Sequence, residues 1–171
     1  MLRVEQVTGD GWTMLRTLRL RALEVDADAF GATLEDEKTR SEAFWRQRIV
    51  TNAWFLAWAA DHAVGLAAVV ASPSLPSAER QLDAMWVVPA WRGRGIGEAL
   101  IGTALDHVSW HGATSVSLTV LDGNRPARSL YQRMGFRPTG ERSPRPRNPS
   151  QMHERFRLIL RSEDHGQVQA N

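Results

Sequence analysis

The stretch Val87-Val88-Pro89-Ala90-Trp91-Arg92-Gly93-Arg94-Gly95-Ile96-Gly97-Glu98-Ala99-Leu100 joins an extended apolar segment to an amphipathic helix through a glycine-rich turn. Three glycines at alternate positions leave the backbone without Cβ atoms, so its N–H groups can converge on an anion at the first turn of the helix. The dipole of that helix also favours negative charge there. Arg92 and Arg94 add cations beside the turn. The stretch therefore predicts a cradle for a phosphate group between a strand and a helix.

The spacing of these glycines excludes two common nucleotide-binding loops. The dinucleotide fingerprint is G-x-G-x-x-G, whereas this turn reads G-x-G-x-G. The P-loop requires Gly-Lys followed by Ser or Thr, and the chain's only lysine is Lys38. Taken alone, the stretch is also consistent with a tight strand-to-helix connection that carries incidental arginines.

A second motif follows at Asn124-Arg125-Pro126-Ala127-Arg128-Ser129-Leu130-Tyr131-Gln132-Arg133-Met134-Gly135-Phe136. It resembles the N-x-x-A-x-x-L-Y-x-x-x-G-F segment of the GNAT superfamily of acyl-CoA-dependent N-acetyltransferases. In the first stretch, Arg92-x-x-Gly95-x-Gly97 matches the Q/R-x-x-G-x-G/A pyrophosphate loop of the same family. The two motifs together, in this order, make a specific match over roughly residues 82 to 136, and the flanking elements match only in type.

Hydrophobic periodicity and turn residues divide the chain into elements that fit this resemblance. Apolar runs predict strands over 2–7, 54–60, 64–70, 81–88, 115–121, 136–139 and 153–160. Helical spacing predicts helices over 11–23, 41–51, 96–111 and 125–134, and segment 142–149 is expected to be a loop. The expected fold is α/β (α+β), a mixed sheet of about six to seven strands flanked by about four helices. The resemblance implies that the parallel strands on either side of the cradle helix splay apart around the pantetheine arm of the cofactor.

Length and composition narrow the class of protein. The 171 residues suit one domain, expected over 1–161, followed by a polar, frayed tail over 162–171. No apolar run is long enough for a membrane span or a signal peptide, which predicts a cytoplasmic protein with no membrane partner. The absence of cysteine removes thiolate metal sites and an acyl-cysteine intermediate. With a net charge of +2 and scattered arginines, no nucleic-acid partner is expected.

Acetyl-CoA is the cofactor that the resemblance implies. A backbone N–H around residues 86–88 is expected to hold the thioester carbonyl as an oxyanion hole does. Asn124 is expected to cap its helix, to contact the pantetheine arm, or both. Arg128 is expected either to reach a cofactor phosphate or to face water. The full set of expected cofactor contacts is Trp86, Val87, Val88, Arg92, Gly93, Arg94, Gly95, Ile96, Gly97, Asn124, Ala127 and Arg128.

Tyr131 is the only tyrosine, and it occupies the position of the family's general acid beside the thioester sulfur. A phenol with a pKa of about 10 is matched to protonating a thiolate whose pKa is about 8.5. The alternative for this side chain is core packing, because Ala127, Tyr131 and Met134 share one helical stripe.

The acceptor site is expected beside segment 24–37, which carries six acidic residues and no basic one. In the family this region forms one wall of the acceptor site, so the resemblance implies an acidic wall that favours a cationic amine, with Phe30, Glu35 and Trp86 as contacts. A solvated loop with acids at a helix start explains the same residues without a ligand. Asp83 is the candidate general base, with Glu35, Glu37 and a water relay as alternatives.

These observations predict an N-acetyltransferase in which a primary amine attacks acetyl-CoA directly in a ternary complex. The identity of the amine stays open. The alternative is a catalytically silent acyl-CoA-binding or sensing domain. No metal is expected, because His107 and His111 lie one helical turn apart but lack the H-E-x-x-H sequence. The tryptophan content and the final strands are compatible with a homodimer.

Overall fold

The computed structural model describes residues 1–160, so the tail expected from residue 162 lies outside the described residues. The expected mixed sheet is confirmed, with seven strands in the order β1-β2-β3-β4-β5-β7-β6. The β4–β5 pair is parallel and every other pair is antiparallel. The strands are β1 (Leu2–Gln6), β2 (Ala53–Ala59), β3 (His62–Val70), β4 (Glu79–Val87), β5 (Ser115–Leu121), β6 (Arg137–Arg145) and β7 (Asn148–Ile159).

The helices follow the predicted positions, with one short addition. Four were expected: α1 (Trp12–Val25), α3 (Glu42–Thr51), α4 (Ile96–Trp110) and α5 (Arg125–Arg133). The additional α2 (Leu34–Lys38) is short and begins where the Thr33 side chain accepts a hydrogen bond from Asp36 N at 3.2 Å. Within residues 1–160, no helix combines the length and the hydropathy needed to cross a bilayer.

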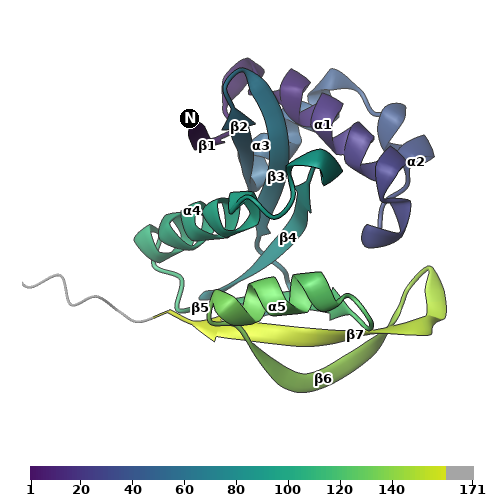
Figure 1. The fold of residues 1–171 in the computed structure, drawn as a ribbon, viewed down its shortest axis with the longest axis vertical. Helices are drawn as coiled ribbons and strands as arrows, with labels where there is room; N and C mark the ends of the chain where they lie inside the picture. Colours follow the sequence, from purple (N-terminus) through teal and green to yellow (C-terminus); the bar gives the residue numbers. More distant parts are fainter. Residues whose placement is uncertain (161–171) are drawn as a thin grey trace, which may run out of the picture.

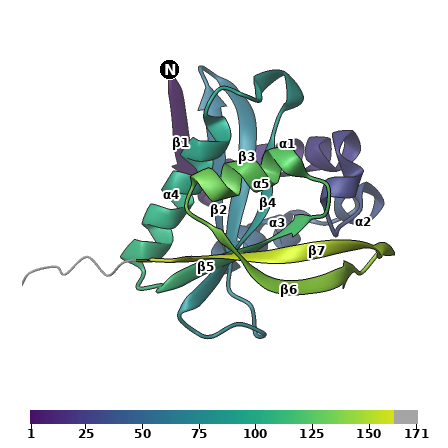
Figure 2. The same ribbon diagram turned by 60° about the horizontal axis from the view of Figure 1, so that its bottom comes forward.

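The sheet opens in its middle. Strands β4 and β5 pair only through Glu79–Ser115, Arg80–Val116 and Gln81–Ser117, after which they separate. Figures 1 and 2 show the result: β1 to β4 form one arm, and β5, β7 and β6 form a second arm that diverges from it. A β-bulge at Ala84, whose φ is +54°, bends β4 at the point of separation. The expected splay of the parallel pair is therefore confirmed.

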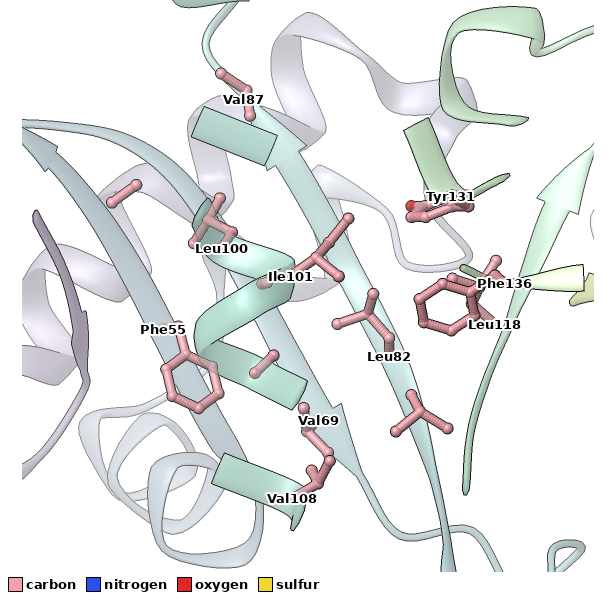
Figure 3. Close-up of a cluster of buried hydrophobic side chains, with 14 of the residues drawn as sticks. Phe55, Val69, Leu82, Val87, Leu100, Ile101, Val108, Leu118, Tyr131 and Phe136 are labelled. Atoms are coloured by element: carbon pink, nitrogen blue, oxygen red, sulfur yellow. The ribbon is translucent and has the colours of Figure 1, made fainter. Parts of the chain in front are cut away.

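Two hydrophobic clusters cover the two faces of the first arm. Alternate residues of β2 point to opposite faces, so Phe55 packs with α4 whereas Trp54 packs with α1 and α3. The cluster around α4 continues to Tyr131 of α5 and Phe136, which face Leu82 of β4 in Figure 3. Both arms thus share one core, which holds α4 and α5 in fixed positions beside the opening.

Segment 142–149 is not the predicted loop. Strand β6 runs on to Arg145 and β7 begins at Asn148, so only residues 146–147 turn. Proline in this segment obscured the strands, since it cannot donate a ladder hydrogen bond. The order of the sheet puts β6 at its edge, where proline is tolerated. A smaller correction concerns β3, which begins at His62, whereas the strand was expected over 64–70.

Candidate active site

The cradle forms at the amino terminus of α4. Gly93 and Gly95 have φ values of +72° and +76°, a region that costs little only for glycine. The first helical hydrogen bond runs from Ala99 N to Gly95 O at 3.0 Å, so the amides of residues 96–98 have no intrahelical acceptor. No side chain caps this helix start. The turn therefore presents free N–H groups to an anion.

Gly97 serves a different purpose from the other two glycines. A Cβ at this position would lie 2.9 Å from Leu130 Cδ2 and 3.3 Å from Met85 Cε. Because it lies inside α4 without a positive φ, glycine here serves the close approach of α4 to α5, and a Cβ would displace the end of the Leu130 side chain. An ion pair between Glu98 and Arg133, 2.7 Å apart, joins the same two helices.

Arg92 is turned towards the protein. Its Nε donates to Val87 O at 3.0 Å, and its Nη2 lies 2.5 Å from Asp26 Oδ2. Asp26 also accepts a hydrogen bond from Trp86 Nε1 at 2.6 Å. The Trp86 hydrogen bond, together with Arg92, holds the pKa of Asp26 below its ordinary value despite partial burial. Through these contacts Asp26 links the end of α1 to β4 and to the cradle. Arg94 is exposed, with Cζ 4.9 Å from the centre of the Trp91 ring.

Two cavities meet in the opening between the arms. The first, of about 590 Å³, contains the cradle, and we call it the cradle cavity. The second, of about 420 Å³, lies between β4, β5 and the loop after α1, and its lining includes Arg19, Arg48, Arg145 and Arg147; we call it the arginine cavity. The residues that line both cavities are Ala29, Met85, Asn124, Ala127 and Tyr131.

Most of the predicted cofactor residues lie together. Asn124 lines both cavities, and its Oδ1 caps α5 by accepting from Ala127 N at 3.2 Å. Val88, Arg94 and Arg128 line neither cavity. Arg128 points to β7, where its Nη1 lies 2.8 Å from Glu154 Oε2. Those that line the cradle cavity are Trp86, Val87, Arg92, Gly93, Gly95, Ile96, Gly97, Asn124 and Ala127.

Tyr131 is both a core residue and a cavity residue. It is 9% exposed, and its ring centre lies 6.0 Å from that of Phe136 in an edge-on arrangement. Figure 3 shows the side chain on α5 with its hydroxyl oxygen turned towards β4. Burial, with a smaller contribution from the negative charge of Asp83, raises the pKa of Tyr131 to about 12. The phenol is therefore protonated at neutral pH and is available as a proton donor.

The predicted acceptor residues are only partly brought together. Phe30 and Asp83 line the arginine cavity, and Asp83 Oδ1 accepts from Ala84 N at 2.7 Å at the bulge. Trp86 lines the cradle cavity. Glu35 lines neither; its side chain is 74% exposed and lies 3.6 Å from Lys38. Glu37 is buried against Arg19 and is not free to act as a base.

The expected acidic wall does not form. Of the six acids in segment 24–37, all within the described residues, only Asp28 lines the arginine cavity. The others bind neighbouring groups or face water, because the loop folds back on α1 and β4. The cavity is instead lined by four arginines that were not predicted as site residues, namely Arg19, Arg48, Arg145 and Arg147.

Two of the cavity residues that were not predicted could have been recognised from the sequence. Arg19 and Arg48 occupy apolar helical stripes, and a charge on a buried stripe indicates a buried ion pair or a site. Arg145 and His153 left no such signal. His153 also lines the arginine cavity, and its Nε2 is buried without a hydrogen-bond partner among residues 1–160. Within the same residues, no group of three or more potential ligands is arranged to hold a metal.

The sequence of this chain is similar to those of known acetyltransferases. The chain is 32% identical over 131 residues to the streptothricin acetyltransferase of Streptomyces lavendulae, covering 76% of this chain and 65% of that protein. It is 42% identical over 59 residues to a mycothiol acetyltransferase of Corynebacterium glutamicum, covering 33% and 20%. The first curated relatives are longer proteins, of which the matched segments cover 20% to 39%.

Solved structures share the fold. The GNAT acetyltransferase of Streptococcus pneumoniae superposes with a TM-score of 0.80 at 16% identity, covering 94% of this chain and 100% of that one. A GNAT-family protein of Desulfovibrio desulfuricans gives 0.74 at 16% identity, covering 93% and 99%. The sequence of residues 15–136, which includes the cradle and the Tyr131 helix, matches the acetyltransferase (GNAT) family, and the chain belongs to that family.

Proposed function

We propose that this chain transfers the acetyl group of acetyl-CoA to an amine by direct attack, with both substrates bound together. The observation that carries the proposal is the position of Tyr131, which lines the cradle cavity and the arginine cavity at their junction. A proton donor at this junction can reach a thioester that enters from the cradle side while an amine approaches from the other side.

The cradle fits the diphosphate of coenzyme A. Free amides at residues 96 and 97, the dipole of α4 and the positive φ of Gly93 and Gly95 all suit an anion that approaches the backbone closely. Beyond Gln81, the β4 backbone has no partner in β5, which leaves its edge available to the pantetheine arm. When bound, acetyl-CoA supplies a thioester whose acetyl group is transferred and whose sulfur leaves as a thiolate.

Tyr131 and Asp83 are the residues that would handle the protons. Tyr131 holds its proton at neutral pH and would donate it from Oη to the departing sulfur. Asp83 lines the same cavity and would accept the proton that the amine loses, directly or through water. Backbone N–H groups near Trp86 would stabilise the negative charge on the carbonyl oxygen.

Tyr131→Phe tests the proposal. Removal of the proton donor should lower kcat by about 100-fold to 10,000-fold. The dissociation constant of acetyl-CoA should change by less than about twofold, because the hydroxyl group is not part of the cradle. A thiol-release assay with a panel of amines measures kcat, and calorimetry measures binding. An unchanged kcat would refute the general-acid role, and tight acetyl-CoA binding without turnover of any amine by the wild type would support a silent binding domain.

Gly95→Ala tests the cradle itself. The left-handed conformation at this position strains any side chain by about 1–2 kcal/mol, so the turn should distort and acetyl-CoA should bind about tenfold more weakly. Gly102→Ala is the matched control, because Gly102 lies in the same helix, has no positive φ and has open space around its Cβ position. Equal affinities of the two variants would contradict the cradle.

A further inference from the structure

The arginine cavity is built from buried positive charges. Arg19 and Arg145 are 4% and 9% exposed, and the side chain of Arg48 is 19% exposed. Burial of an ionised group is costly unless an opposite charge lies close to it. Each of these three guanidinium groups therefore needs a negative charge nearby.

One carboxylate serves two of the arginines. Glu37 Oε2 lies 3.1 Å from Arg19 Nε, and Glu37 Oε1 accepts from Arg19 Nη2 at 3.2 Å. The same Oε1 lies 3.1 Å from Arg48 Nη1. Arg19 Nη1 remains buried without a hydrogen-bond partner among residues 1–160. Glu37 therefore neutralises one of two adjacent positive charges and leaves a donor unused.

Arg145 has only neutral partners. Its Nη1 donates to Gln151 Oε1 and its Nη2 to Phe30 O, both at 3.0 Å. No carboxylate of residues 1–160 lies within ion-pair distance of it. Phe30 connects this group to the other two, because Arg19 Cζ lies 4.5 Å from the centre of the Phe30 ring. The fourth arginine of the cavity, Arg147, is exposed and lies 3.4 Å from Asp36 Oδ2. Arg19, Arg48 and Arg145 thus have one ion-pair partner among them, Glu37.

Two acids line the same cavity. Asp83 and Asp28 line it and form no ion pair within residues 1–160. Asp83 lies on β4, and its charge acts both on Arg48 and on Tyr131 at the junction with the cradle cavity. The cavity therefore offers cations to a negative group of a ligand and the Asp83 carboxylate to a positive group, next to the proposed proton donor.

On the basis of the proposed function, we infer that the acceptor amine also carries a carboxylate, as a free amino acid does. Its carboxylate would bind at Arg19, Arg48 and Arg145, where it would supply the missing negative charge and an acceptor for the unused donors. Its ammonium group would lie beside Asp83 and lose a proton there before it attacks. This acceptor class differs from the cationic amine that an acidic wall would select.

Matched pairs of acceptors test the inference. Free amino acids and their carboxamides have nearly the same shape and share the amine, but only the acids carry the negative charge. The wild type should acetylate the acids with kcat/KM at least tenfold above that of the amides. Equal values, or a preference for peptides with a free amino terminus over free amino acids, would overturn the inference while leaving acetyl transfer intact. Absence of turnover with every amine would instead overturn the proposed function.

Substitution of an arginine tests where the carboxylate of the acceptor binds. Arg145→Met should lower the acid-to-amide ratio of kcat/KM at least tenfold, and Arg145→Lys should keep part of the preference. This ratio does not depend on the fraction of folded enzyme, so partial loss of folding cannot imitate the effect. Arg21→Met, at an exposed residue of α1 that lines neither cavity, should leave the ratio unchanged. An unaltered ratio in Arg145→Met would contradict the assignment.

A binding measurement on the wild type gives an independent check. With coenzyme A present, N-acetylated amino acids should bind at least tenfold more tightly than their amides, as measured by calorimetry. Equal affinity would contradict a carboxylate site at the arginines.

Discussion

Glu37 and Glu79 are both buried glutamates that pair with two arginines, but their surroundings differ. Glu79 begins β4 and binds Arg155 and Arg157 of β7. Arg155 also pairs with Glu141 at 2.8 Å, so two arginines meet two glutamates. This cluster lies at the closed end of the β4–β5 pair and lines neither of the cavities described above. Its balanced charges join β4, β6 and β7.

Glu37 has partners that line the cavity between β4 and β5, and those partners outnumber it. Arg19 and Arg48 share it, and Arg145, which borders the same cavity, has no carboxylate partner within residues 1–160. The comparison teaches that a buried ionic cluster stabilises the fold when its charges balance. When a surplus of one sign borders a cavity, the cluster indicates a site for a ligand of the other sign.

Glu37→Gln should have the largest effect on stability. It leaves two buried guanidinium groups without a counter-charge, so the free energy of unfolding should fall by about 4 kcal/mol. Urea denaturation measures the change. Glu35→Gln, on the same short helix but exposed, is the control and should change stability by less than about 0.5 kcal/mol. A stable Glu37→Gln variant would show that the cluster does not depend on this carboxylate.

Glu79→Gln should cost somewhat less, about 3 kcal/mol, because the side chains of Arg155 and Arg157 stay 23% and 41% exposed to water. Glu141→Gln is the matched control, since that exposed carboxylate binds the same Arg155 and should cost less than about 1 kcal/mol. Binding of an N-acetylated amino acid should stabilise Glu37→Gln more than it stabilises the wild type, and so restore part of the lost stability. It should stabilise Glu79→Gln only as much as it stabilises the wild type. Equal recovery in both variants would remove the distinction between the two clusters.

The pH dependence of stability should show the smallest effect. Burial acts to raise the pKa of Glu79, but hydrogen bonds from Ser117 and Arg155 and the charges of both arginines outweigh it, so the pKa lies below the ordinary value of 4.5. A carboxyl whose pKa is lowered by folding stabilises the protein above that ordinary value and loses this contribution as the pH falls through the folded-state pKa. The stability difference between the wild type and Glu79→Gln should therefore shrink below about pH 4. A difference that stays constant down to pH 2.5 would contradict this role.

Local signals in the sequence were sufficient for much of the fold. Strand β5 was predicted with its observed bounds, because alternation over 115–121 depends only on neighbouring residues. The cap at Asn124 and the glycine turn before α4 were also predictable, since each is set by residues a few positions apart. The strands around 142–149 were not predicted, because the tolerance of proline depends on their place at the sheet edge.

The arginine cavity could not be predicted in the same way. Arg145 meets Phe30 across 115 positions of sequence, and no local pattern reports such a contact. The acidic composition of segment 24–37 led to the wrong expectation of an acidic wall, because a composition gives the charges but not the residues that pair with them. Glu37, for example, is occupied by two arginines from α1 and α3. Tyr131 was found only because its helix resembles a family motif, since its spacing alone favours core packing.

A crystal structure of the complex with coenzyme A most directly tests whether the two cavities hold the two substrates. The diphosphate should lie against the amides of residues 93–97, and the sulfur should lie within about 3.5 Å of Tyr131 Oη, at the junction with the arginine cavity. Coenzyme A bound with its sulfur away from Tyr131, or with its diphosphate elsewhere, would contradict the assignment of both cavities.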